Sequence, residues 1–307
     1  MRETVSPDVS VFDRRIVRLH RDRAARKFGE HDFLMREIGD RLVDRLADVA
    51  RDFPLALDLG CRGGVLGGLL TGRGKVGSLI HADLSPSMAR AVGNGPSVVA
   101  DEEVLPFQEN RFDLVASLLG LHWVNDLPGA LVQINRVLKP DGLFIAAMFG
   151  GDTLSELRQS LMDAELDTEG GVSPRVSPFA DLRDAGGLLQ RAGFALPVAD
   201  SDTVTVTYAD PFALMKDLRG MGETNAVHHR RKTPTRRATL MRAAQLYHDR
   251  HADADGRIPA TFQVLYLTGW RPHETQQQPL KPGSATGRLA DALGTEERGA
   301  GEKARPK

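Results

Sequence analysis

A glycine-rich turn between an apolar strand and an apolar helix constrains the fold of this chain more than any other feature. Residues 54–59 are apolar apart from Asp58 and predict a buried strand, and a helical pattern of apolar residues begins at Val65. Three of the five residues 60–64 are glycine. Such a turn brings backbone N–H groups and a helix N-terminus close to a ligand, and glycine suits it because it lacks a Cβ and adopts positive φ.

The spacing within this turn favours an amino-acid moiety over a pyrophosphate. The run 58–64 nearly matches D-x-G-x-G-x-G, but Arg62 occupies the middle glycine position. A dinucleotide pyrophosphate favours the different spacing G-x-G-x-x-G, whereas Asp58 offers an acceptor for an amine. We predict that Asp58, Gly60, Cys61 and Gly64 contact the ligand, and that Arg62 alters the turn.

Short apolar strands alternate with helices between residues 54 and 149. The predicted strands are 54–59, 76–82, 96–100, 112–118 and 142–149, and the predicted helices lie near 64–71, 86–92 and 127–138. This alternation predicts a parallel sheet with right-handed crossovers, so the fold class is α/β. Ligands of such sheets bind beyond the carboxyl ends of the strands.

The flanking regions predict additional helices and the rest of the sheet. Residues 11–50 predict helix with a basic first half, and residues 153–166, 179–191, 211–219 and 235–250 predict helices. Further strands are predicted near 194–199, 203–208 and 261–270. We divide the chain into an N-terminal helical segment (1–50), a ligand-binding core (51–150), a cap that also completes the sheet (151–270) and a disordered tail (271–307).

Acidic residues end three successive predicted strands. Asp58 ends the first, Asp83 the second and Asp101 the third. An acid about 20 residues after a glycine turn accepts hydrogen bonds from ribose hydroxyls. We therefore predict an adenosine-containing cofactor, with Asp83 and the adjacent Leu84 at the ribose, and Asp101 with Glu102 at the adenine.

Composition excludes several classes of site and partner. The formal net charge is −1, so no nucleic-acid partner is expected, and the single cysteine, Cys61, forms no internal disulfide. No apolar run reaches the roughly 18 residues of a transmembrane segment. The N-terminus has no apolar signal core, and we predict a cytoplasmic protein. No metal site is expected, because we predict that His228, His229, His248 and His251 lie on a solvated surface.

The core resembles the class I S-adenosylmethionine-dependent methyltransferases. The motifs that carry this resemblance are LDLGC (57–61), DLSPSM (83–88), LPF (105–107), FDLV (112–115) and RVLKPDG (136–142). It implies a Rossmann-like seven-stranded sheet with an antiparallel last strand, N-terminal helices and an α-helical cap. It also implies that the cofactor is S-adenosylmethionine, with its methionine end at Asp58 and the turn 60–64.

A narrower resemblance is to the assembly factor 5 family of respiratory complex I (NADH:ubiquinone oxidoreductase). It rests on VFDR (11–14), LHWVNDLP (121–128), FGGDTL (149–154), EGGVSP (169–174), GMGETN (220–225) and PATFQ (259–263). This resemblance implies hydroxylation of an arginine on the quinone-site subunit of complex I. It implies a protein partner, and the basic run 14–27 is a candidate for peripheral contact with the inner membrane.

Two other functions stay open. Segments 153–157, 217–218 and 259–261 also resemble the malonyl-acyl-carrier-protein methyltransferase of biotin synthesis, which implies methyl transfer to a carboxyl group or another small-molecule acceptor. The third alternative is a non-catalytic assembly chaperone that binds the cofactor and a nascent subunit.

Four residues are candidates for catalysis or substrate binding. His122 and Trp123 follow the fourth predicted strand, where they either move a proton and shape the pocket or pack beneath the next helix. Glu223 and Asn225 lie in a glycine-containing loop, as substrate contacts or as turn formers. Asp152 is expected to be the N-cap of helix 153–166.

Overall fold

The computed structural model describes residues 10–73, 75–276, 287, 291 and 294–295. The chain divides into two compact units, Met1–Pro272 and His273–Lys307, and the helices and strands named below belong to the first. Most of the tail predicted from residue 271 lies outside the described residues.

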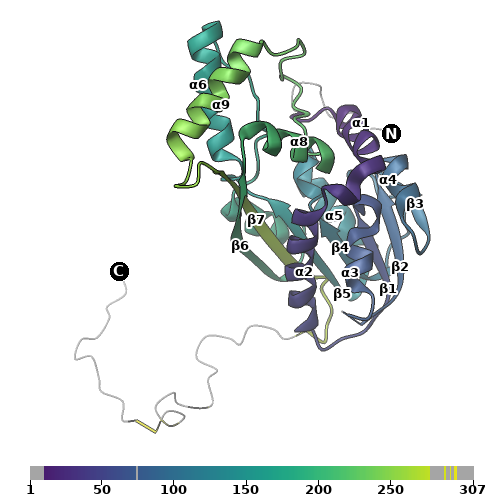
Figure 1. Ribbon diagram of the computed structural model, residues 1–307. Coiled ribbons are helices and arrows are strands. Elements are labelled where there is room, and N and C mark those ends of the chain that lie inside the picture. The colour runs from purple at the N-terminus through teal and green to yellow at the C-terminus, as the bar shows by residue number, and fades with distance from the viewer. Residues whose placement is uncertain (1–9, 74, 277–286, 288–290, 292–293, 296–307) are drawn as a thin grey trace. The chain divides into compact units, whose positions relative to one another are not determined.

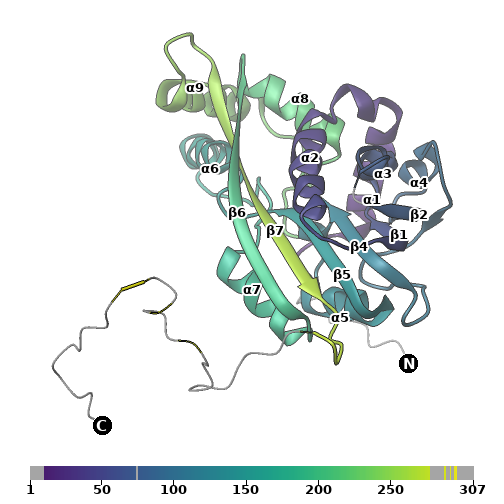
Figure 2. The same ribbon diagram turned by 90° about the horizontal axis from the view of Figure 1, so that it is seen from below.

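A seven-stranded sheet with the order β3-β2-β1-β4-β5-β7-β6 forms the centre of this unit (Figures 1 and 2). The strands are β1 (Phe53–Leu59), β2 (Val76–Asp83), β3 (Ser97–Val99), β4 (Phe112–Leu118), β5 (Leu138–Phe149), β6 (Ala195–Tyr208) and β7 (Ile258–Trp270). The strands β1 to β5 are parallel, and β7 runs antiparallel to both of its neighbours, β5 and β6. This topology confirms the predicted Rossmann-like α/β fold.

Helices cover both faces of the sheet (Figure 2). The first face carries α2 (Phe33–Ala47), α3 (Val65–Leu70), α6 (Ser155–Glu169), α8 (Pro211–Met221) and α9 (Arg237–His251), which share one apolar core with the sheet. The second face carries α5 (Leu127–Val137) and α7 (Leu182–Arg191), which form a separate apolar core with it. Burial of these two apolar layers supplies the main driving force for folding.

The predicted N-terminal helix is interrupted. It consists of α1 (Arg14–Ala24), a 3₁₀ helix (Ala25–Glu30) and α2. The interruption lies at Lys27, whose φ of −130° is not helical. Asp13 begins α1 because its side chain accepts a hydrogen bond from the backbone N–H of Ile16 at 3.2 Å. The break allows α1 and α2 to take different directions, and α1 approaches the end of the sheet near α4 (Pro86–Ala91; Figure 1).

Two details between residues 150 and 210 differ from the sequence prediction. The strands predicted near 194–199 and 203–208 are one strand, β6. The expected N-cap at Asp152 is wrong, because α6 begins at Ser155 and its N-cap position is Leu154, with a left-handed φ of 55°. Asp152 instead accepts a hydrogen bond from Gln263 at 3.3 Å.

A helix that crosses a bilayer needs a long apolar stretch, and none of the helices among the described residues has one.

Candidate active site

The glycine turn lies between β1 and α3 and is fixed by the neighbouring strand. The backbone N–H groups of Gly60 and Cys61 both donate to the carbonyl of Ala82, at 2.8 and 3.0 Å. Gly60 has a φ of +75°, and a Cβ there would lie 3.4 Å from the Cα of Gly120. Arg62 also has a positive φ, +46°, which is unfavourable for a residue with a Cβ. Gly60 and Arg62 are therefore both left-handed, and Arg62 is in a strained backbone conformation.

Asp58 is buried at the end of β1, where its carboxylate contacts β2. Its Oδ2 lies 2.9 Å from Nδ1 of His81, while its Oδ1 has no hydrogen-bond partner. Burial raises the pKa of Asp58, and the contact with His81 only partly offsets this effect. An unpartnered buried oxygen costs free energy, so this atom is suited to a donor such as an amine.

Asp83 and Glu102 share a buried arginine from α1. Nη1 of Arg21 lies 2.8 Å from Oε1 of Glu102 and 3.4 Å from Oδ1 of Asp83. Arg14 contacts Glu102 as well and donates to Oδ1 of Asp101 at 2.5 Å. Burial opposes ionisation of Glu102, but the charges of Arg21 and Arg14 outweigh it and hold the pKa of this carboxyl well below its usual range.

The participation of α1 is the feature that the sequence analysis missed. The basic run 14–27 is predicted as a surface for peripheral membrane contact, but the side chain of Arg21 within it is 0% exposed. The Nε and Nη2 atoms of Arg21 have no hydrogen-bond partner. Arg14 and Arg21 are seven residues apart, so they lie on the same face of a helix. This spacing, together with the acids at the strand ends, is the signal that could have identified them.

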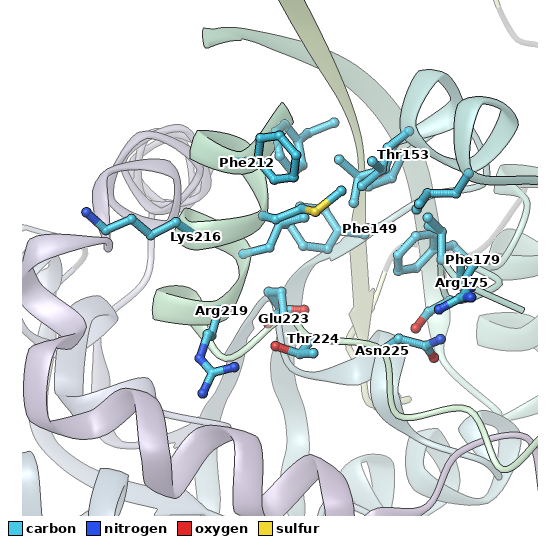
Figure 3. Close-up of a pocket in the computed structure, with 18 of the residues that line it drawn as sticks. Phe149, Thr153, Arg175, Phe179, Phe212, Lys216, Arg219, Glu223, Thr224 and Asn225 are labelled. Atoms are coloured by element: carbon cyan, nitrogen blue, oxygen red, sulfur yellow. The ribbon is translucent and has the colours of Figure 1, made fainter. Parts of the chain in front are cut away.

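A cavity of about 600 Å³ lies between the sheet and helices α6, α8 and α9 (Figure 3). Its walls are mainly apolar and include Phe149 of β5, Leu157 of α6, Met215 of α8 and Phe262 of β7. Trp123, Glu223, Thr224 and Asn225 also line it. Three of the four candidate residues named from the sequence thus line the cavity, and the fourth, His122, contacts Glu223.

Glu223 is the centre of a buried hydrogen-bond network at this wall. Its side chain is 4% exposed. Its Oε2 accepts hydrogen bonds from Nε1 of Trp123 at 2.8 Å and from Nε2 of His122 at 3.0 Å. Nδ1 of His122 lies 3.5 Å from the backbone N–H of Phe149. These contacts assign His122 as the neutral tautomer with the proton on Nε2.

The second oxygen of Glu223 faces the glycine turn. Its Oε1 lies 2.8 Å from Nη2 of Arg62. The guanidinium of Arg62 also donates to the carbonyls of Leu119 and Met221, at 3.0 and 3.2 Å. Burial opposes ionisation of Glu223, but the charge of Arg62 and the hydrogen bond from His122 outweigh it and lower the pKa of Glu223 to about 2. An ion pair therefore joins the glycine turn to the cavity.

The remaining predicted residues have mainly structural contacts. The side-chain amide of Asn225 donates to the carbonyl of Pro174 at 2.7 Å and accepts from the N–H of Val227 at 2.9 Å, so it shapes its loop. Cys61 is buried, and burial raises the pKa of its thiol. Leu84 packs against the cluster that contains Trp123. Within the described residues, no group of three or more His, Cys, Asp or Glu side chains could hold a metal ion.

Comparisons with known proteins agree with this architecture. The family described as "Methyltransferase domain" matches residues 57–146. Two solved structures, a Bacillus halodurans protein described as a methyltransferase and the YcgJ protein of Bacillus subtilis, align with TM-scores of 0.53 each and identities of 14% and 15%. They cover 76% and 77% of this chain and 99% of each other chain, and they show the fold.

Sequence relatives define the family more closely. The human protein named "Arginine-hydroxylase NDUFAF5, mitochondrial" is 47% identical over 93% of this chain and 84% of its own length. The zebrafish protein of the same name is 47% identical over 92% of this chain and 89% of its own length. A malonyl-[acyl-carrier protein] O-methyltransferase of Halorhodospira halophila is 36% identical over 88% of this chain and 92% of its own length. This chain belongs to the arginine-hydroxylase NDUFAF5 family of proteins with a methyltransferase domain.

Proposed function

We propose that this protein binds S-adenosylmethionine at the carboxyl ends of β1 to β4 and hydroxylates an arginine of a protein partner. The observation that carries the proposal is the identity of 47% with the human arginine-hydroxylase over 93% of this chain. The cavity supports it, because a mainly apolar space with Glu223 in its wall suits a long side chain with a cationic end.

The residues at the strand ends fit the cofactor. Asp83 and Asp101 are acceptors at the positions that ribose hydroxyls and the adenine amine require. The buried Nε and Nη2 atoms of Arg21 are donors without a partner, and ribose oxygens are acceptors for them. Asp58 has a free acceptor, Oδ1, for the methionine amine. Gly60, which lacks a Cβ, would let the backbone approach that end of the cofactor closely.

The partner that we propose is the quinone-site subunit of complex I, following the resemblance of the whole folded chain to the complex I assembly factors. The exposed residues of α1 include Arg15, Arg18 and Leu19, and this mixed basic and apolar face is suited to peripheral contact with an anionic inner membrane. We therefore propose that the protein is cytoplasmic and contacts the inner membrane peripherally through α1.

A deletion strain tests the proposed hydroxylation directly. Complex I would be isolated from strains with and without the gene, and peptides of the quinone-site subunit compared by mass spectrometry. We expect the mass of one added oxygen atom on an arginine in the parent strain, its absence in the deletion strain and its return with the wild-type gene. An arginine that keeps this oxygen without the protein would refute the proposal.

Methyl transfer is the second candidate, because the malonyl-[acyl-carrier protein] O-methyltransferase relative covers 88% of this chain. Bound S-adenosylmethionine would supply an activated methyl group. The test is formation of S-adenosylhomocysteine with malonyl-acyl-carrier protein as acceptor. We expect none, because this chain is 47% identical to the human arginine-hydroxylase but only 36% identical to this methyltransferase. A chaperone without chemistry would restore complex I assembly even when Glu223 and Asn225 are replaced.

A further inference from the structure

The cavity and the glycine turn meet at one carboxylate, and that carboxylate already holds a guanidinium. Glu223 lines the cavity, while its Oε1 lies 2.8 Å from Nη2 of Arg62 in the turn. The other contacts of the Arg62 guanidinium are two backbone carbonyls, those of Leu119 and Met221. A guanidinium has only hydrogen-bond donors, so this carboxylate and the two carbonyls could equally accept hydrogen bonds from the guanidinium of another arginine.

We propose that Glu223 is the receptor for the guanidinium of the substrate arginine, and that Arg62 occupies this receptor until the substrate enters. The inference rests on the proposed function, since it assigns residues to the recognition of its substrate. Arg62 then competes with the substrate for Glu223. On binding, the guanidinium of the partner protein's arginine replaces that of Arg62 at this carboxylate.

The walls of the cavity suit the rest of an arginine side chain. The methylene stem of arginine packs on apolar surface while its head is hydrogen-bonded, and Phe149, Leu157 and Phe262 provide such surface. Of the cavity's own cations, Lys216 and Arg219 are exposed and extend away from Glu223 (Figure 3), and Arg175 is paired with Glu165. They leave the negative charge of Glu223 available to an incoming guanidinium.

The pair between Arg62 and Glu223 is suited to exchange because its bonding is incomplete. Oε1 of Glu223 is buried and forms no well-aligned hydrogen bond, although it lies within ion-pair distance of Arg62. Arg62 has an unfavourable φ of +46°. Burial lowers the pKa of Arg62, and so does the neighbouring charge of Arg21, which means that its cationic form is poorly stabilised here. A substrate guanidinium that is free to align with Oε1 of Glu223 would form the hydrogen bond that Arg62 does not form.

The experiment compares two small probes that differ in charge. N-acetyl-L-arginine amide and its neutral isostere N-acetyl-L-citrulline amide would be titrated into the full-length protein. The chain has two tryptophans, and in a Trp270→Phe background Trp123 alone reports on the site through its bond to Glu223. We expect the arginine probe to change this fluorescence and to bind at least about tenfold more tightly than the citrulline probe, because only the arginine probe offers a charged donor to the carboxylate.

Three variants separate recognition from a structural role. Glu223→Gln should abolish the preference for arginine. Asp113→Asn, which removes a buried carboxylate that pairs with Lys139 at the opposite end of β4, should retain it. Arg62→Gly should bind the arginine probe more tightly than the wild type, because the competitor is gone and glycine accepts the positive φ. If the ion pair had only a structural role, Arg62→Gly would instead bind the arginine probe more weakly than the wild type.

Two results would overturn the inference. One is a folded Glu223→Gln variant that keeps the preference. The other, decisive even if that variant does not fold, is an affinity of Arg62→Gly for the arginine probe that is unchanged or weaker. These results can be told apart from those of the deletion strain. If the arginine is still hydroxylated in the deletion strain, the proposed function is refuted. If hydroxylation depends on this protein but the arginine probe is not preferred, only the role of Glu223 as the receptor is refuted.

Discussion

At the scale of single residues, His122 is a buried neutral base, and this gives the stability of the protein a defined pH dependence. Burial lowers the pKa of His122, and the charge of Glu223 opposes this effect without cancelling it. The unfolded chain takes up a proton near pH 6.5, whereas the folded protein does so only at lower pH. The contribution of His122 to the free energy of unfolding is therefore complete above about pH 6.5. It decreases as the pH is lowered, by at most about 1.4 kcal/mol per pH unit.

The variant His122→Gln isolates this contribution, since glutamine can still donate to Glu223. We expect urea unfolding between pH 5 and pH 7.5 to show a shallower pH dependence in this variant than in the wild type. Burial also lowers the pKa of His20, to about 4, so part of the slope remains. His248→Gln, at an exposed position on α9, is the matched control and should keep the wild-type slope. Equal slopes in His122→Gln and the wild type would contradict the assignment.

At the scale of elements, α1 is attached to the sheet by a buried ion pair as well as by apolar contacts. Arg21 and Glu102 are both 0% exposed. We expect Arg21→Met to lower the free energy of unfolding by about 3 kcal/mol, because it leaves the buried charge of Glu102 with fewer partners. The double variant Arg21→Met/Glu102→Gln should be less destabilised than the sum of the single variants, by about 1–3 kcal/mol.

Urea unfolding of the four proteins in this cycle measures the coupling. Arg242→Met is the control, because Arg242 pairs with Asp167 on the surface at 2.9 Å and such pairs contribute about 0–1 kcal/mol. Additive effects of Arg21→Met and Glu102→Gln would show that the pair of Arg21 with Glu102 does not stabilise the attachment of α1.

The elements also show why part of the structure was predictable and part was not. The parallel strands and the acids at their ends follow from local patterns, such as the apolar run before Asp58. The burial of Arg21 was not predictable in this way, because its partner Glu102 is 81 residues away in the sequence. The sequence predicts two strands in place of β6 because Asp200 and Asp202 interrupt the apolar alternation. They are tolerated on this edge strand because Arg45 and Arg41 of α2 pair with them.

The candidate site was predictable to a similar extent. Asp83, Glu102 and Glu223 could be named from strand ends and a loop, but their arginine partners could not. From the sequence, Arg62 can be recognised only as a departure from the glycine pattern of the turn. Its role as a bridge to Glu223 depends on a loop 159 to 161 residues later in the chain, which no local pattern specifies.

At the scale of the whole molecule, the sheet joins the segments that the sequence analysis separated. β7 lies between β5 and β6, so residues 151–270 complete the sheet that begins in residues 51–150. Phe149 and Phe262 belong to the same apolar core. Because both segments contribute to one sheet and one core, we expect them to fold together as one cooperative unit.

Two truncated chains test this cooperativity. A chain that ends at Pro272 retains the first compact unit, and we expect it to unfold in a single thermal transition with a Tm within about 2 °C of the full chain. A chain that ends at Gly150 loses the strand that pairs with β5 along 143–149, so its apolar edge and core are exposed, and it should show no cooperative transition. Calorimetry measures both. A cooperative transition in the shorter chain would instead establish residues 1–150 as an independent domain and residues 151–270 as a true cap, and the ion pair of Arg62 with Glu223 would then join two domains.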